Sequence, residues 1–138
     1  TAEELKLTIG TAFPRDEVVT KECRGRDLVT GLPKSVEVTS DEMMDALEEP
    51  LHAICEAVHN VLEITPPELA ADISNSGIII TGGGALLCGI DKRIEDRTAI
   101  KVVVAEDPKS CVAVGTGKSL DILEKLESSS LNRRAPYL

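Results

Sequence analysis

The spacing of apolar residues changes several times along the chain, and each change predicts a different element. Spacings of three and four residues are typical of amphipathic helices, whereas short apolar runs bounded by turn residues are typical of strands. Expected helices cover 1–9, a long stretch from Thr39 past Val61, and then 66–73, 86–94 and 108–126. Expected strands cover 18–24, 35–39, 77–81 and 101–105. Helices and strands therefore mix, which predicts an α/β fold.

Local signals refine three of these elements. The turn-rich segment 25–33 lies between the first two strands and predicts a β-hairpin. Thr39 and Glu42 have the spacing of a capping box at the start of the long helix. Pro50 lies inside that helix and should kink or break it. The strands 77–81 and 101–105 are read as buried, and 128–138 is expected to be a loose tail.

Charge and composition narrow the possible partners. The chain has 15 basic and 24 acidic residues among 138, a net charge of −9. This charge argues against nucleic acid or an anionic membrane as the main partner, because both attract cationic surfaces. Four cysteines lie about thirty residues apart without a CxxC pair, which favours a reducing, cytoplasmic setting. The acidic start Thr1–Glu4 is unlike a signal peptide, and we expect the chain to be a fragment of a longer one.

The most specific chemical signal is the run Thr81-Gly82-Gly83-Gly84-Ala85 between a predicted strand and a predicted helix. Glycines let a ligand approach the backbone closely, and a helix N-terminus adds partial positive charge. A phosphate or nucleotide suits such a turn. A tight turn without any ligand explains the same residues equally well.

Three other patterns carry less weight. A dinucleotide fingerprint would use Gly82 and Gly84 with Glu106 or Asp107, but position 87 is Leu instead of the third glycine. The segment 114–119 resembles half of a phosphate loop, but position 112 is Val and a helix is expected before it. Gly115 and Gly117 are better explained as close packing points of a helix.

His52, Cys55 and His59 share one face of the long helix, as metal ligands do. The simpler interpretation is a solvent-flanking face with Cys55 partly buried. We expect no tight zinc binding there, because one helix edge supplies three ligands at most and no supporting shell.

Several motifs together resemble the MreB/Mbl family of bacterial actins, from Thr1 to about Leu126. They are Arg24-Gly25-Arg26-Asp27-Leu28-Val29-Thr30-Gly31-Leu32-Pro33, Thr65-Pro66-Pro67-Glu68-Leu69-Ala70-Ala71-Asp72-Ile73, Thr81-Gly82-Gly83-Gly84-Ala85-Leu86-Leu87, Ala105-Glu106-Asp107-Pro108 and Gly115-Thr116-Gly117-Lys118. Cys88 departs from the family, which often has Arg there, and His52 and His59 replace ordinary surface residues.

The resemblance implies part of an actin-like ATPase fold, namely the C-terminal part of its second large lobe. Residues 1–48 would form most of the small subdomain IIB, and 49–127 the C-terminal part of subdomain IIA. The family's adenosine motif matches Thr81, Gly82, Gly83, Gly84, Ala85 and Leu86, which would line the base and ribose of ATP. Its Glu-x-x-Lys pair matches Glu3 and Lys6, where a carboxylate accepts from ribose hydroxyls and a lysine stem packs on the purine.

The resemblance also implies what this chain lacks. The family's phosphate-binding hairpins, its Mg²⁺-binding acids and its membrane-contacting segments would lie before Thr1. We therefore expect no catalytic residue in this chain, weak ATP affinity and no hydrolysis by the chain alone. The whole protein would be a cytoplasmic filament protein at the inner face of the membrane. It would act with cell-wall synthesis proteins to maintain rod shape.

Two other classes stay open at this point. One is an actin-like or sugar-kinase-like nucleotide-binding lobe that does not polymerise, and the other is a protein-interaction module. For the chain on its own, the strand 77–81 would leave an apolar edge and face uncovered. Such an edge favours pairing between chains, so the isolated chain is expected to self-associate.

Overall fold

The structure of the chain, a computed structural model, describes residues 1–120 and 123. The α/β class is confirmed, because helices and two separate two-stranded sheets alternate along the chain. The elements are α1 (Ala2–Ile9), β1 (Thr20–Arg26), β2 (Pro33–Thr39), α2 (Ser40–Ile64), α3 (Pro67–Ser76), β3 (Ile78–Ile80), the short 3-10 helix η1 (Gly83–Leu86), α4 (Ile90–Thr98), β4 (Val102–Val104) and α5 (Cys111–Leu120).

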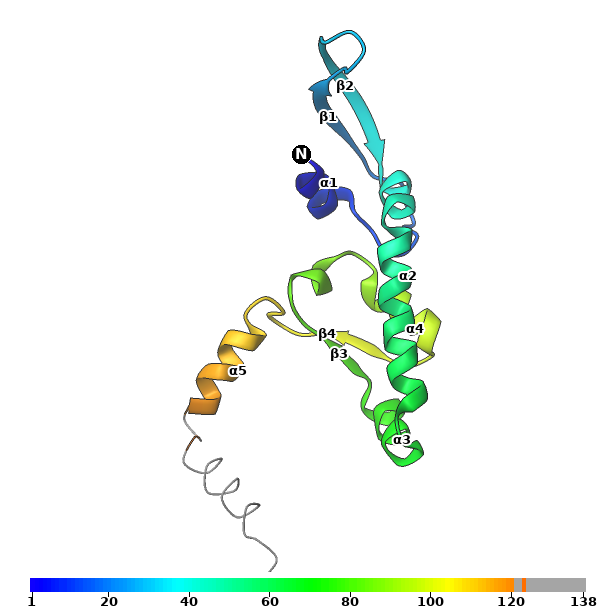
Figure 1. Cartoon of the computed structure of the whole chain (residues 1–138), viewed down its shortest axis with the longest axis vertical. Helices are drawn as coiled ribbons and strands as arrows, with labels where there is room; N and C mark the ends of the chain where they lie inside the picture. The colour runs from blue at the N-terminus through cyan, green and yellow to red at the C-terminus, as the bar shows by residue number, and fades with distance from the viewer. Residues whose placement is uncertain (121–122, 124–138) are drawn as a thin grey trace, which may run out of the picture.

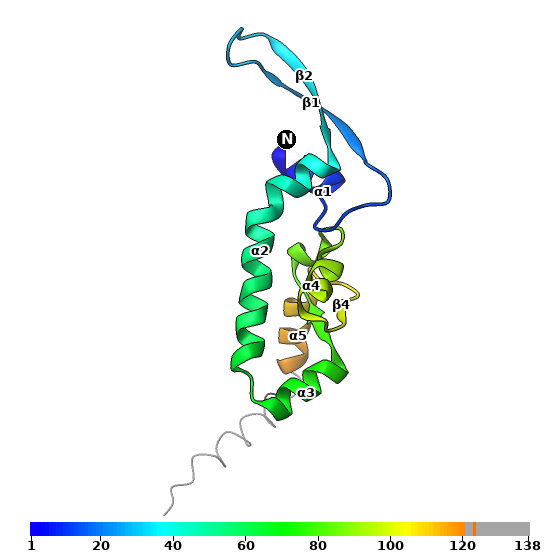
Figure 2. The same ribbon diagram turned by 90° about the vertical axis from the view of Figure 1, so that its right-hand side faces the viewer.

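The described residues form an elongated molecule with the hairpin β1–β2 at one end and α3 at the other (Figure 1). The long helix α2 runs between these ends, and α4 with the β3–β4 pair lies beside it (Figure 2). In the part of the chain that the structure describes, no helix has both the length and the apolar run needed to cross a membrane.

The hairpin β1–β2 is confirmed, with strand ends that differ from the prediction. β1 pairs antiparallel with β2 from Thr20 opposite Thr39 to Arg26 opposite Pro33. The Asp27 carboxylate accepts the backbone N–H of Val29 at 2.8 Å and so fixes the turn. The Asp27 N–H also donates to the Leu32 carbonyl at 2.9 Å, so pairing continues to Arg26 and Pro33, nearer the turn than the sequence pattern indicated.

Helix α2 is continuous, so of the two effects predicted for Pro50, a kink or a break, the break is wrong. Its start carries the predicted capping box: the Thr39 hydroxyl accepts the Glu42 N–H, and the Glu42 carboxylate accepts the Thr39 N–H. Pro50 is exposed and lies inside the helix. The first turns of α2 lie at an angle to the rest (Figure 2), a bend of the kind that proline produces. The expected division between residues 48 and 49 falls within this helix and stays a prediction.

The two inner strands pair in parallel, with Ile78 opposite Val102 and Ile80 opposite Val104. Gly77 leads into β3 with φ +82°, and a Cβ there would lie 2.8 Å from the Lys101 carbonyl oxygen. The prediction that these strands are buried is only half right. Ile79 is 69% exposed, because the described helices cover one face of the pair and leave the other open.

The core lies where α2 and α4 meet the covered face of β3–β4. Its buried members come from three elements, α2, α4 and β4, and from the loop after α1: Ala12, Leu51, Cys55, Ile90, Ile94 and Val102. Leu47, Val58, Ile78, Ile80 and Leu87 pack against them. The core is aliphatic, as the scarcity of aromatic residues requires. All four cysteines are free thiols.

Two predicted helices begin later than expected. The helix expected over 86–94 is instead α4 from Ile90, because Gly89 in the left-handed region (φ +74°) separates it from η1. The last helix begins at Cys111 instead of Pro108, since 108–110 form a turn in which Ser110 donates to the Asp107 carbonyl. Its expected end at 126 and the expected tail 128–138 lie outside the described residues.

The packing role expected for the glycines of α5 is wrong. A Cβ built on Gly115 or Gly117 meets nothing within 4 Å, and α5 has no buried residue. These glycines therefore hold no neighbouring element close among the described residues.

Candidate functional site

The glycine turn after β3 is open on its outer side. A Cβ built on Gly82, Gly83 or Gly84 meets nothing within 4 Å, so the backbone of all three is accessible to a ligand. Gly82 has φ +85°, a conformation that side chains rarely adopt. Glycine at Gly83 and Gly84 is not required by the turn itself, since their φ values are ordinary and space is free. A ligand that lies against the backbone would explain why glycine occupies both positions, because a side chain there would keep the ligand away.

The same turn is anchored on its inner side. The Gly82 N–H donates to the Pro108 carbonyl at 2.6 Å, which ties the turn to the loop after β4. The next residue that is buried is Ala85, and Leu87 packs against the core. Thr81 and Leu86, also predicted for this site, are exposed on either side of the glycines. The turn is therefore a fixed, open stretch of backbone.

Helix α1 presents different residues on two faces. Glu3 and Lys6 form an exposed ion pair of 2.7 Å with each other. Glu4 instead pairs with Lys21 of β1 at 2.8 Å, and this hydrogen bond lowers the pKa of the Glu4 carboxyl. Lys21 and Glu4 hold the hairpin against α1, which leaves Glu3 and Lys6 available to another partner.

The segments that follow α1 and η1 are joined directly. Thr11 and Cys88 form an isolated parallel bridge, in which the Ala12 N–H donates to the Cys88 carbonyl at 2.8 Å. The Thr11 hydroxyl is buried and donates to the Phe13 carbonyl at 2.6 Å. A Cβ at Gly89 would lie 2.7 Å from the Phe13 Cβ, so only glycine allows this approach.

This junction relates the two groups of predicted site residues. Thr11 lies just after α1, which carries Glu3 and Lys6. Cys88 lies just after η1, which contains Gly83 and Gly84 of the glycine turn. The structure thus joins the two segments, while Glu3 and Lys6 pair with each other. Thr11, Ala12 and Gly89 were missed by the sequence interpretation. Gly89, the glycine directly after Cys88, is the sequence feature that could have indicated a close approach between these two segments.

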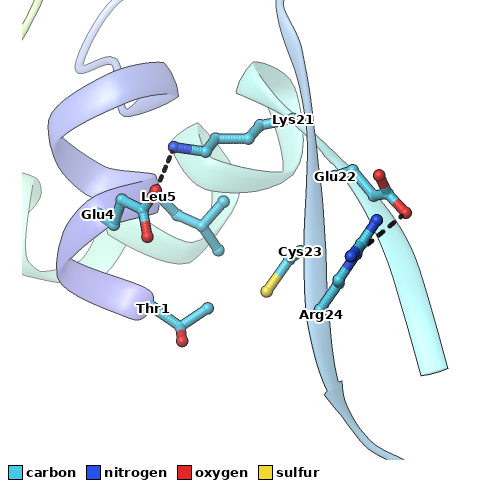
Figure 3. A pocket seen from close by; sticks show the side chains of 7 residues that line it. All are labelled: Thr1, Glu4, Leu5, Lys21, Glu22, Cys23 and Arg24. Atoms are coloured by element: carbon cyan, nitrogen blue, oxygen red, sulfur yellow. Dashed lines mark hydrogen bonds and ion pairs between the residues drawn. The ribbon is translucent and has the colours of Figure 1, made fainter. Parts of the chain in front are cut away.

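A shallow hollow of about 340 Å³ lies between α1 and β1. Figure 3 shows the Lys21–Glu4 pair across it, with the Cys23 sulfur on the β1 side. Its lining residues are Thr1, Glu4, Leu5, Lys21, Glu22, Cys23 and Arg24, none of which was predicted for the nucleotide. It lies on the face of α1 opposite to the one predicted to meet a nucleotide.

The other candidate motifs do not form sites in the described residues. Cys55 is 2% exposed and packs in the core, whereas His52 and His59 are exposed, so the prediction that Cys55 is partly buried is corrected to full burial. His59 faces Glu63 at 3.2 Å. Among the described residues no three His, Cys, Asp or Glu side chains gather as a metal site. That zinc does not bind tightly there stays a prediction.

The half phosphate loop at 114–119 is helical, since it lies within α5. The Thr116 and Ser119 hydroxyls donate to the carbonyls of Val112 and Gly115 within the same helix. A phosphate-binding loop presents its backbone amides to the ligand instead. This segment therefore has the wrong local structure for that role.

Known proteins are similar to this chain over most of its length. The family model "MreB/Mbl protein" matches residues 1–128. The chain is 47% identical over 131 residues to the cell shape-determining protein Mbl of Bacillus cereus, covering 95% of this chain and 39% of that protein. It is 51% identical over 124 residues to the cell shape-determining protein MreB of Escherichia coli, covering 90% of this chain and 36% of that protein.

Solved structures of an MreB protein match the fold of this chain. MreB5 of Spiroplasma citri bound to ADP matches with a TM-score of 0.86 and 37% identity, over 93% of this chain and 39% of that one. The same protein bound to AMPPNP matches with a TM-score of 0.85 and 36% identity. The chain spans less than half the length of these relatives, and its fold is part of the actin-like ATPase fold. These matches favour the bacterial actins over a sugar-kinase-like lobe or an interaction module, and the chain belongs to the MreB/Mbl family.

Proposed function

We propose that the whole protein carrying this chain is an ATP-binding, filament-forming bacterial actin that maintains cell shape, and that this chain supplies the adenosine side of its nucleotide cleft. The relatives at 47% and 51% identity are named as cell shape-determining proteins. The matching MreB5 structures carry ADP and AMPPNP. These names and ligands support the proposal. The matches themselves cover only a part of each relative.

The observation that carries the proposal is the anchored, open glycine turn. Gly82, Gly83 and Gly84 have free space beside them, while the Gly82–Pro108 hydrogen bond fixes the turn. Such a turn lets an adenosine lie directly against backbone, where any side chain would intrude. Glu3 on α1 would accept from the ribose hydroxyls, and the Lys6 stem would pack on the purine.

ATP hydrolysis would depend on residues that lie outside this chain. Mg²⁺ and the residues that position water would belong to the other side of the cleft, so this chain alone would bind ATP weakly and hydrolyse none. The whole protein would work in the cytoplasm at the inner face of the membrane. It would form filaments with itself and act with proteins of cell-wall synthesis.

The test uses Gly83→Ala in the whole protein that carries this chain. A methyl group fits at Gly83 without contact to the protein, so folding should be unchanged while ATP affinity falls about tenfold, or roughly 1.4 kcal/mol. Fluorescent ATP titration measures the affinity, and thermal unfolding measures the stability.

The control is Gly115→Ala, which adds the same methyl group at another open position, in α5. It should leave ATP affinity unchanged. Equal ATP affinity in Gly83→Ala, Gly115→Ala and the unmodified protein would contradict the placement of adenosine at the turn. Competition with GTP in the same titration measures the base preference.

A further inference from the structure

The hydroxyl of Thr11 lies where the two parts of the proposed nucleotide site meet. The residue is 1% exposed. Its hydroxyl donates to the Phe13 carbonyl at 2.6 Å and lies 3.3 Å from the Cys88 carbonyl oxygen, which also accepts the Ala12 N–H. Breaking such contacts is costly, because a buried polar group that loses its partner finds no water to replace it. Thr11 therefore fixes the segment after α1 against the segment after η1.

The Cys88 side of this junction is fixed to the glycine turn. Between them, the Ala85 N–H donates to the Gly82 carbonyl at 3.2 Å, and the Leu87 N–H donates to the Gly84 carbonyl at 3.1 Å. Ala85 is buried and Leu87 packs against the core. The short segment that carries the open glycines therefore also determines where Cys88 lies.

The other side of the junction is fixed to α1. Ile9, in the last turn of α1, is 2% exposed, and the Gly10 N–H closes that turn on the Lys6 carbonyl at 3.1 Å. The Arg15 guanidinium returns to the same end of the helix and donates to the Gly10 carbonyl at 3.1 Å. Helix α1 therefore leads directly into Thr11 without a flexible link.

The position of Glu3 depends strongly on the angle at which α1 leaves this junction. Glu3 lies near the far end of α1, whose 8 residues span about 12 Å at about 1.5 Å per residue. A tilt of about 10° at Thr11 would move Glu3 by about 2 Å, which is enough to break a hydrogen bond of ordinary length. The exposed Glu4–Lys21 pair resists such a tilt only weakly, because surface ion pairs contribute little.

We infer that Thr11 is a positioning residue for ribose recognition. Its hydroxyl holds α1 so that the Glu3 carboxylate accepts from the 2′-hydroxyl of a ribose whose base lies at the glycine turn. Thr11 is buried and acts only through the position of α1. The inference rests on the proposed function, in which Glu3 is the acceptor for the ribose hydroxyls. It adds the origin of a preference for ribonucleotides over 2′-deoxyribonucleotides.

The ratio of ATP affinity to 2′-deoxy-ATP affinity reports the position of Glu3. A site rejects an analogue that lacks a hydroxyl when its acceptor for that hydroxyl is held in place and would be left without a partner. An acceptor that can move into water rejects the analogue much less. The two nucleotides share their base and phosphates, so changes in those contacts alter both affinities equally and leave the ratio unchanged.

The test measures both affinities by competition with fluorescent ATP, in the whole protein that carries this chain. The unmodified protein should bind ATP about tenfold more tightly than 2′-deoxy-ATP. Thr11→Val keeps the branched side chain without the hydroxyl and should lower this ratio to about twofold or less, through weaker binding of ATP alone. Thr11→Ser retains a hydroxyl and should preserve the ratio.

The matched control is Thr98→Val. The Thr98 hydroxyl is also half-buried or better shielded from water and bonds to nearby backbone, since it donates to the Ile94 carbonyl at 2.8 Å and accepts the Ile100 N–H at 3.3 Å. Its loss should lower the thermal unfolding temperature, as the loss of the Thr11 hydroxyl does, while the ratio of the two affinities stays unchanged. Equal ratios in Thr98→Val and Thr11→Val would show that Thr11 has only a structural role.

Arg15→Met gives a second measurement that does not require Thr11→Val to fold. It removes the donor to the Gly10 carbonyl at a half-buried position and should lower the ratio at least about twofold. Glu3→Gln should lower the ratio as Thr11→Val does. The protein with both of these changes should have the same ratio as Glu3→Gln alone, because both act through one hydrogen bond to the ribose.

The outcomes separate this inference from the proposed function. An unchanged ratio in a folded Thr11→Val protein, or in Arg15→Met if the former does not fold, would overturn the inference. Additive losses in the protein that combines Thr11→Val with Glu3→Gln would also overturn it. If the unmodified protein binds ATP and 2′-deoxy-ATP equally, the role of Thr11 is refuted and ATP binding at the glycine turn stands. If it binds neither, the proposed function is refuted and the inference with it.

Discussion

The backbone N–H of Ala12 donates to the carbonyl of Cys88 at 2.8 Å and joins two segments that are distant in the sequence. On one side of this hydrogen bond lies the loop after α1, and on the other lies the loop after η1. It belongs to a parallel bridge whose Thr11 side chain is buried. The position of α1 relative to the glycine turn is therefore held by backbone hydrogen bonding, which is independent of the ion pairs on the surface.

Neighbouring glutamates of α1 should respond differently to substitution. In the whole protein carrying this chain, Glu3→Gln should weaken ATP binding about tenfold, because it weakens the proposed acceptor for the ribose hydroxyls. Glu4→Gln removes the partner of Lys21 on the other face and should leave ATP binding unchanged. Fluorescent ATP titration distinguishes the two, and equal affinity in both variants would refute the assignment of Glu3.

Gly89→Ala should destabilise the protein by about 1–3 kcal/mol. The φ of +74° is unfavourable for alanine, and the added Cβ would lie 2.7 Å from the Phe13 Cβ. Urea unfolding of the whole protein measures the change. The matched control Gly115→Ala, in a helix with free space, should instead stabilise by about 0.5–1 kcal/mol. A Gly89→Ala protein as stable as the control would show that the junction tolerates a side chain.

The ion pair between Glu48 of α2 and Arg93 of α4 should make stability depend on pH on the acid side. The hydrogen bond from Arg93 lowers the pKa of the Glu48 carboxyl. The pair is therefore fully formed above the ordinary glutamate pKa of about 4.3, and its contribution is lost as pH falls through the lowered folded-state pKa. Electrostatic attraction to His52 and Arg97 lowers the pKa of the Glu48 carboxyl further.

Glu48→Gln should accordingly flatten the acid limb of the stability profile, measured by thermal unfolding at a series of pH values. Glu49→Gln, at the next position, forms no ion pair among the described residues and serves as the control. An unchanged acid limb in Glu48→Gln would show that the pair is open in solution.

The 138-residue chain on its own should self-associate. β3 and β4 form a sheet of only two strands, and Ile79 and Val103 are exposed on its open face. Two strands rarely form a stable sheet in water, and an uncovered apolar face favours contact with another chain. Light scattering across a range of concentrations checks this, and a monomer with cooperative unfolding at every concentration would exclude it.

Local sequence signals predicted the elements whose contacts are themselves local. The capping box of Thr39 and Glu42 and the hairpin turn at Asp27 are made by residues close in sequence, and both are present. The start of α4 was missed because Gly89 takes its left-handed conformation against Phe13, a residue far away in the sequence. The exposure of Ile79 was missed because an apolar run does not show whether one face or two are covered.

The candidate site also has parts that local sequence signals predicted and parts that they did not. The glycine turn was predicted from its residues, since three glycines after an apolar run indicate close approach whatever the fold. Glu3 and Lys6 came only from the family resemblance, because an acidic and a basic residue three positions apart are common on any exposed helix. The spacing of residues does not indicate the bridge between Thr11 and Cys88, because it joins two segments that are far apart in the sequence.

The 25 residues of α2 set the distance between the β1–β2 hairpin and α3, which lie at the two ends of the described molecule (Figure 1). A helix rises about 1.5 Å per residue, so α2 spans about 37 Å along its path, less the shortening that its bend produces. Adding or removing one turn of α2 would change the distance between these two ends by about 5.4 Å and leave the hairpin and α3 themselves as they are.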